Sequence, residues 1–196
     1  MILIDKFKFN FGENRNAVEQ KIQTISNSLN ISPDWLMLVM LQESGLNSRA
    51  VNKQKGDPDD AFIRAKTRAT GLIQFMPATA TGLGTSTQAL YNMNAIQQLD
   101  YVHKYYLPYK SKIQNFHDLY LATFFPAAMG KDNDYVFQTS KISAATIAVQ
   151  NPTFDLNKDG KVTIAEFREY ITKRVPAQFL DLVKKKDLSS EQVALS

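Results

Sequence analysis

The chain has 196 residues, of which 44% are hydrophobic and 11% aromatic, and its formal net charge at pH 7 is +4. These values predict a globular protein with one main domain and exclude a disordered chain. No apolar run approaches the roughly 20 residues of a spanning helix, so we expect no membrane insertion. The absence of cysteine excludes disulfides, thiolate metal sites and cysteine nucleophiles.

The first segment, residues 1–16, begins MILIDKFKFNF and lacks the long apolar core and cleavage site of a secretory signal. We therefore expect a protein made in the cytoplasm that reaches any extracellular target by another route.

Two helices are predicted next. Apolar residues recur at helical spacing over 17–29. Ser32 is then suited to cap a second helix with Pro33 at its first position, and Gly45 is suited to end it. This second helix contains WLMLVML at residues 35–41, which is apolar on nearly all sides, so we expect it to be buried.

A polar excursion follows over residues 47–70, which we expect either to fold over a site or to be mobile. The apolar segment GLIQFMPATA occupies residues 71–80, with Pro77 suited to start a helix. Further helical patterns lie at about 92–106, 115–129 and 138–149, and Pro176 begins a last one. We divide the chain after residue 16 into a helical domain at 17–150, a loop and exiting helix at 151–175, and a C-terminal helix and tail at 176–196.

Glu43 is a candidate catalytic acid because it stands where the buried helix ends, between Leu41 and Leu46. Partial burial raises the pKa of a carboxyl group, which favours a proton donor. A glycosidic oxygen leaves readily only when it is protonated as the bond breaks, and a glutamic acid can supply that proton. The alternative is a solvated carboxylate in the last turn of a helix.

Three short motifs resemble the soluble lytic transglycosylase family, which has a lysozyme-like fold. They are Glu43-Ser44-Gly45-Leu46-Asn47, then Ala69-Thr70-Gly71-Leu72-Ile73-Gln74-Phe75-Met76-Pro77, then Thr79-Ala80. The resemblance covers about residues 17–130. It implies cleavage of the β-1,4 bond between N-acetylmuramic acid and N-acetylglucosamine in bacterial peptidoglycan, with a single glutamate as acid and base.

The resemblance also implies roles for individual residues. Glu43 would be the catalytic acid and Ser44 would support it or the sugar. Gln74 would hydrogen-bond the glycan from the opposite wall of the cleft, and Phe75 and Met76 would shape the pocket. Core packing is the alternative for both of these, and for Met76 it is the favoured one.

One helix departs from the family pattern. Where the family has a tyrosine near the catalytic carboxyl, this chain has Phe124, which has no hydroxyl. Tyr120, one turn earlier, is a candidate to supply a hydroxyl to the substrate site, although a core or rim position is the favoured interpretation.

The excursion also carries Asp57, Asp59 and Asp60, which leaves two mechanisms open. A lone glutamate suits attack by the muramic acid 6-hydroxyl and a 1,6-anhydro product. A second carboxylate about 6.5–9.5 Å away would instead position a water for inverting hydrolysis. We favour the lone glutamate, because Asp-rich turns with Gly and Pro are usually solvated.

A second motif, DLNKDGKVTIAE at residues 155–166, resembles a single EF-hand-like calcium loop. The expected ligands are Asp155, Asn157, Asp159, the carbonyl of Lys161 and Glu166, with Gly160 at the sharp turn. A turn without metal is the alternative. Because only one loop is present, we expect structural calcium rather than a sensor, and no cofactor for catalysis.

The sequence therefore predicts a mainly α protein: a lysozyme-like domain with an appended EF-hand-like loop and C-terminal helices. Its expected function is lytic transglycosylation of peptidoglycan. The alternatives are a hydrolytic muramidase and a non-catalytic, calcium-dependent glycan-binding module. No aromatic-basic stripe or Gly-rich motif supports nucleic-acid binding. A peptidoglycan target without a signal sequence suggests a bacteriophage endolysin or a component of a phage tail or virion.

Overall fold

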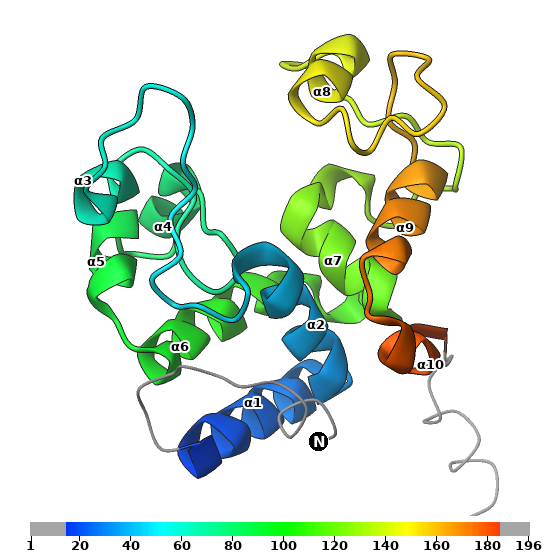
Figure 1. Ribbon diagram of the computed structural model, residues 1–196. Helices are drawn as coiled ribbons and strands as arrows, with labels where there is room; N and C mark the ends of the chain where they lie inside the picture. The colour runs from blue at the N-terminus through cyan, green and yellow to red at the C-terminus, as the bar shows by residue number, and fades with distance from the viewer. Residues whose placement is uncertain (1–14, 185–196) are drawn as a thin grey trace, which may run out of the picture. The chain divides into compact units, whose positions relative to one another are not determined.

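The computed structural model describes residues 15–184 (Figure 1), so the segment 1–14 and the tail from residue 185 lie outside the described residues. The α-helices are α1 (Arg15–Leu29), α2 (Pro33–Ser44), α3 (Ala61–Ala65), α4 (Pro77–Gly82), α5 (Thr87–Asn92), α6 (Ala95–Tyr106), α7 (Phe116–Phe124), α8 (Ala144–Gln150), α9 (Ile164–Lys173) and α10 (Leu180–Lys184). Short 3-10 helices are η2 (Leu107–Lys112), η3 (Pro126–Ala128) and η4 (Ala177–Phe179). Within the described residues, β-pairing is limited to isolated bridges and no strand is formed. The prediction of a mainly α fold is confirmed.

The chain divides into two compact units between Lys110 and Ser111. This division differs from the predicted domain boundary after residue 150. The reason lies in α7, whose aromatic side chains pack with those of the later segments. Phe124 stacks on Phe167 with ring centroids 5.4 Å apart and lies 4.5 Å from the ring of Phe154.

The first unit is built around α2, as its composition predicts. Every residue of α2 from Asp34 to Met40 is buried. The helix begins where expected, because the Ser32 side chain accepts a hydrogen bond from the Asp34 amide at 3.3 Å and Pro33 occupies the first turn. The helix α1 packs against both α2 and α6. The start of α2, the buried helix that carries Glu43, is therefore determined by residues next to it in the sequence.

The second unit has its own aromatic core. Phe137 and Phe167 are fully buried, and Phe167 contacts four other rings. The segment before α8 runs beside the start of α9, because the Phe137 amide donates to the Val162 carbonyl at 2.8 Å and the Ile164 amide to the Tyr135 carbonyl at 3.1 Å. This pairing holds the 155–166 loop against the unit's core.

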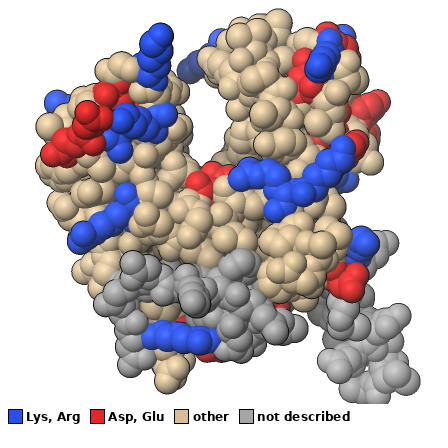
Figure 2. All heavy atoms as spheres, viewed as in Figure 1, with Lys and Arg blue, Asp and Glu red and all other residues tan. Residues whose placement is uncertain are grey.

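Three predicted helices are shorter than expected. The pattern at 138–149 gives a helix only over α8, and the pattern at 115–129 ends at Phe124 because Pro126 follows. The last pattern becomes η4 and α10 rather than one helix. On the face shown in Figure 2, acidic and basic side chains lie beside one another on both units, in keeping with the net charge of +4.

Candidate active site

Glu43 is the penultimate residue of α2 and is half-buried. The helix ends directly after it because Gly45 adopts a left-handed conformation with φ of 61°. The Gly45 amide donates to the Leu41 carbonyl at 2.9 Å, and the Leu46 amide donates to the Met40 carbonyl at 3.2 Å. The carboxylate is thus carried by the last turn of a helix whose preceding turns are buried.

Ser44 joins this helix end to the second motif. Its hydroxyl lies 2.9 Å from the carbonyl oxygens of Met40 and Leu72. The first contact is within α2, and the second reaches 28 residues along the chain. Ser44 therefore fixes the position of the 70–75 turn relative to Glu43, a supporting role of the kind that the resemblance implies.

The 70–75 turn is a tight reversal closed by two backbone hydrogen bonds between Thr70 and Phe75, at 3.1 and 2.9 Å. Gly71 has a φ of 84° and Gln74 a φ of 53°. A side chain at Gly71 would place its Cβ 2.4 Å from Oε1 of Gln98. Only glycine fits this position, for both conformational and steric reasons.

Gln98 is a positioning residue that sequence reasoning missed. It is fully buried on α6, and its Oε1 accepts a hydrogen bond from the Leu72 amide at 2.9 Å. Its Nε2 donates to the carbonyls of Ser48 and Leu90, both at 2.6 Å. One side chain thereby joins the 70–75 turn, the start of the excursion and α5. A polar residue on the apolar face of α6 was the only sequence signal for it.

Gln74 is half-buried, and its side chain is engaged within the turn. Nε2 donates to the Gly71 carbonyl at 3.0 Å and to the Ala50 carbonyl at 3.3 Å. These two contacts use only the amide nitrogen of Gln74. Its amide oxygen can therefore accept a hydrogen bond from another group.

Phe75 and Met76 have opposite environments. Phe75 is 2% exposed and meets the ring of Tyr105 edge-on at 6.2 Å, so it offers almost no surface to a substrate. Met76 is 55% exposed, so core packing, the favoured interpretation of this residue, is wrong. The cause is the turn itself, which directs Phe75 inward and leaves Met76 outside as the residue before Pro77 and α4.

Tyr105 is a second residue that sequence reasoning missed. It lies on α6 and its pKa is raised, first by burial and then by Tyr109 and by the negative charge of Glu43. A raised pKa keeps the phenol protonated at neutral pH, so its hydroxyl remains a donor. The only sequence signal was the run Tyr105-Tyr106 at the end of the helix, which does not indicate which of the two phenols is influenced by the charge of Glu43.

The excursion at 47–70 folds back onto the second motif. The Gly71 amide donates to the Ala50 carbonyl at 2.8 Å and the Asn52 amide donates to the Ala69 carbonyl at 3.0 Å. Asp57 forms a bidentate ion pair with Arg68 at 2.7 and 2.8 Å. The hydrogen bond from Arg68 is the largest of the effects that lower the pKa of Asp57.

The other two candidate second carboxylates also have partners. Asp59 is exposed and pairs with Lys53 at 2.6 Å. Asp60 caps α3 by accepting hydrogen bonds from the amides of Phe62 and Ile63 at 2.8 and 3.1 Å. All three aspartates therefore hold the excursion together.

Tyr120 lies in the second unit and is 1% exposed. Its ring packs against Phe116 and Phe167, and its hydroxyl accepts a hydrogen bond from Arg174 at 3.5 Å. This is the core environment favoured for Tyr120 from the sequence. Phe124, which the sequence resemblance compares with the family's tyrosine, is likewise part of the second unit's aromatic core.

The 155–166 loop makes its sharp turn where the sequence predicts, with Gly160 at φ of 81°. The Asp155 carboxylate accepts hydrogen bonds from the amides of Asp159 and Gly160 at 3.1 and 3.0 Å. Asn157 Oδ1 accepts from the Asp159 amide at 2.9 Å, and Asp159 accepts from the Lys161 amide at 2.9 Å.

Glu166 is buried and bonds the loop from its far end. Oε1 accepts from the amides of Leu156 and Asn157 at 3.1 and 3.3 Å. Oε2 accepts from the amide and hydroxyl of Thr163 at 2.9 and 2.8 Å, which forms a capping box at the start of α9. Within residues 15–184 no group of three or more His, Cys, Asp or Glu side chains is arranged to hold a metal ion. The ligand types suit calcium, but the carboxylates bond loop amides and do not converge.

Comparison with known proteins gives one match. Residues 20–103 match the family model described as Transglycosylase SLT domain. No curated protein and no solved structure gives a match to the chain. A helix long and apolar enough to cross a membrane does not occur in the described part of the chain.

The matched segment lies inside the first unit and contains Glu43, Ser44, the 70–75 turn and Gln98. The helical structure agrees with the lysozyme-like fold of such domains, and the prediction of an enzyme that acts on peptidoglycan is confirmed. The segment from residue 20 to residue 103 is thus similar to transglycosylase SLT domains, a family of lytic transglycosylases that act on peptidoglycan.

Proposed function

We propose that Glu43 is the general acid and base that cleaves the bond between N-acetylmuramic acid and N-acetylglucosamine. The observation that carries this proposal is the hydrogen bond from Ser44 to the Leu72 carbonyl at 2.9 Å. It joins the helix end bearing Glu43 to the turn bearing Gln74. A half-buried carboxyl group and an amide side chain are thereby held on two rigid elements of one unit.

The proposed reaction begins with proton donation from Glu43 to the glycosidic oxygen as the bond to C1 breaks. The muramic acid 6-hydroxyl then attacks C1 and gives up its proton to the same carboxylate, which restores the acid. The products are a 1,6-anhydro-muramic end and a free 4-hydroxyl on N-acetylglucosamine. No water is consumed, so no second carboxylate is required.

The engagement of the three aspartates supports this route over hydrolysis. An inverting hydrolase needs a second carboxylate that activates water. Asp57 is neutralised by Arg68, Asp60 is used as a helix cap, and Asp59 pairs with Lys53. Each would have to leave a partner before it activated water.

The test is a digest of purified peptidoglycan by wild type and Glu43→Gln, followed by mass spectrometry of the soluble muropeptides. We expect anhydro-muramic products from wild type and a loss of roughly 10²–10⁴-fold in rate for Glu43→Gln. Glu169→Gln is the matched control, because Glu169 is exposed in an i,i+4 pair with Lys173 and its loss costs little. Reducing ends from wild type would establish a muramidase instead.

A non-catalytic glycan-binding module is the alternative outcome. In that case neither wild type nor Glu43→Gln would release products, although both would sediment with insoluble peptidoglycan. Delivery as a phage lysin or virion component stays a prediction.

We also propose that the 155–166 loop binds calcium as a structural ion. The support is the spacing of oxygen ligands and the sharp turn at Gly160. Asp155, Asn157, Asp159, Lys161 and Glu166 would hold the ion, which would supply positive charge to fix the loop. Since Glu166 bonds three amides in the structure, calcium would compete with the capping box at Thr163.

Calorimetric titration with calcium of wild type and Glu166→Gln tests this second proposal. We expect binding by wild type and none by Glu166→Gln, with a rise in the Tm of wild type alone. If neither protein binds calcium while Glu166→Gln has a lowered Tm in chelator, the loop is held by Glu166 without metal.

A further inference from the structure

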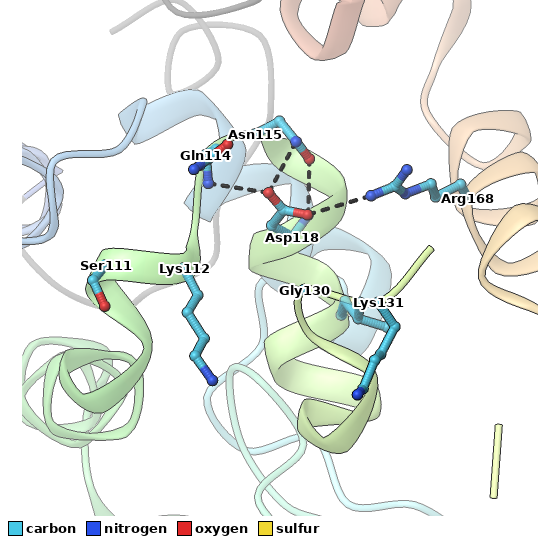
Figure 3. Close-up of a pocket in the computed structure, with 9 residues that line it drawn as sticks. Ser111, Lys112, Gln114, Asn115, Asp118, Gly130, Lys131 and Arg168 are labelled. Atoms are coloured by element: carbon cyan, nitrogen blue, oxygen red, sulfur yellow. Dashed lines mark hydrogen bonds and ion pairs between the residues drawn. The ribbon is translucent and has the colours of Figure 1, made fainter. Parts of the chain in front are cut away.

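A polar pocket of about 410 Å³ lies within the second unit, apart from every residue discussed above for catalysis or calcium (Figure 3). Its wall comes from the end of η2, the connection from η2 to α7, α7 itself, the chain after η3 and one residue of α9. The side chains of Lys112, Lys131 and Arg168 are the three cations that line it, and Asp118 is its one carboxylate.

The carboxylate of Asp118 is saturated by neighbouring donors. Oδ2 accepts hydrogen bonds from the Gln114 amide at 3.1 Å and the Asn115 side chain at 2.9 Å, and Arg168 approaches Oδ1 at 3.5 Å. Burial is the main cause that raises the pKa of Asp118. Asp118 therefore orders the end of the pocket nearest the start of α7 and does not neutralise the lysines.

The two lysines have no acidic partner. Neither Lys112 nor Lys131 forms an ion pair within the described part of the chain, and both are exposed. In Figure 3 the two lysine side chains extend to the same side, away from Asp118 and Arg168. Nε of Arg168 is buried and lacks a hydrogen-bond acceptor. Lys131 also lies over the ring of Tyr135 at 5.9 Å, and the other nitrogens of Arg168 contact Asn133 and Asp118. The lining thus offers three positive charges against one negative charge, and neither ammonium group has a carboxylate partner.

Such a lining recognises an oxyanion. Ammonium and guanidinium groups bind carboxylates through charge-assisted hydrogen bonds, which are roughly twice as strong as neutral ones. The pocket also exceeds what a single ion would fill. Its remaining lining contains no aromatic ring and consists of Ser111, Gln114, Asn115, Leu121 and Gly130. A neutral sugar would leave both ammonium groups without a counter-charge.

We infer that this pocket binds a free carboxylate of a peptidoglycan stem peptide. The inference relies on the proposed function only in naming peptidoglycan as the polymer, since the glycan strand is neutral and its acidic groups lie on the peptides. The second unit would then select wall that carries peptides, while the first unit cleaves the glycan.

The experiment measures binding by calorimetry of a disaccharide-peptide muropeptide to the full-length protein. This monomer contains no bond between N-acetylmuramic acid and a following N-acetylglucosamine, so the measurement does not depend on turnover by Glu43. The comparison ligand is the same muropeptide with its carboxylates amidated. We expect amidation to weaken binding by roughly tenfold or more, and added salt to weaken only the free-carboxylate form.

The variant Lys112→Gln/Lys131→Gln removes the two unpaired charges. It should bind the free-carboxylate muropeptide roughly tenfold or more weaker than wild type and the amidated one equally well. The matched control, Lys110→Gln/Lys141→Gln, removes two other exposed lysines outside the pocket lining and should bind as wild type does. Unchanged Tm values would show that both double variants fold.

Three results would overturn the inference. Equal affinity of wild type for both muropeptides would show that the pocket does not bind a carboxylate. An equal loss of affinity in the control variant would show that only the net charge of the protein matters. Binding to whole cell wall that disappears when phosphodiester polymers are stripped from it would assign the pocket to phosphate instead. A failure of Glu43→Gln to abolish cleavage would overturn the proposed function alone.

Discussion

At the scale of single residues, the position of Tyr105 leads to a prediction about turnover. Its hydroxyl lies within the electrostatic influence of Glu43, and burial keeps it protonated. Tyr105→Phe retains the ring that packs on Phe75 and Tyr106 and removes only the donor. We expect kcat to fall about tenfold, which corresponds to roughly 1.4 kcal/mol in the barrier, with little change in Tm.

Tyr101→Phe is the control for this change. Tyr101 is on the same helix and is also half-buried, but its ring faces Lys104 at 4.9 Å. Wild-type kcat in Tyr105→Phe, measured on the same peptidoglycan preparation, would remove Tyr105 from the catalytic site.

His117 leads to a prediction about pH and stability. Burial, followed by the charge of Arg168, lowers its pKa from 6.5 to about 4, and its Nε2 lies 2.8 Å from the Thr172 hydroxyl. The unfolded chain then binds more protons than the folded one between about pH 4 and pH 6.5. Stability should rise with pH through this window and level off above it, by up to roughly 3 kcal/mol.

The measurement is urea unfolding at pH 4.5, 5.5, 6.5 and 7.5 for wild type and His117→Gln. The variant retains a polar partner for Thr172 and cannot titrate, so its stability should vary less over the window. Parallel curves for the two proteins would show that His117 does not cause the dependence.

At the scale of elements, the 70–75 turn is the part of the site that depends most on one backbone position. Gly71→Ala would place a methyl group 2.4 Å from Gln98 Oε1 at a φ of 84°. We expect a loss of about 2–4 kcal/mol in the free energy of unfolding, together with a loss of activity, because Gln98 must leave the Leu72 amide.

Gly84→Ala separates steric clash from backbone strain. Gly84 has a φ of 79°, but its added Cβ meets nothing within 4 Å. This variant should lose only about 1 kcal/mol and keep its activity. Equal losses in the two variants would show that Gln98 adjusts freely and does not position the turn.

At the scale of the whole molecule, each of the two units has its own core, so a core substitution should affect one unit. Phe167→Ala removes a fully buried ring that contacts Tyr120, Phe124, Phe137 and Phe154. We expect a loss of about 3–5 kcal/mol in the second unit. Trp35, the only tryptophan in the sequence, is buried in the first unit and reports on that unit alone.

The two units can therefore be followed in one denaturant titration. Trp35 fluorescence should give the same midpoint for wild type and Phe167→Ala, while the circular dichroism of the variant should show an additional transition at lower denaturant. A Trp35 midpoint that moves with the substitution would contradict separate unfolding.

The sequence by itself determined what depends on residues close together in the chain. Ser32, Pro33 and Gly45 set the ends of α2, since caps and left-handed terminators act within one turn of the helix. Residues close together in the sequence also predicted that Glu43 stands at the end of a helix and that the chain turns sharply at Gly160. The family motifs identified the enzyme class without any knowledge of the fold.

Only the tertiary structure decided which distant residues meet. Gln98 bonds Leu72 across 26 positions, Ser44 bonds Leu72 across 28, and the charge of Glu43 contributes to the raised pKa of Tyr105 on another helix. The assignment of α7 to the second unit likewise depends on rings from far along the chain. The physical reason is that helical periodicity shows which side of a helix is apolar, whereas the path of the chain between elements determines what that side contacts.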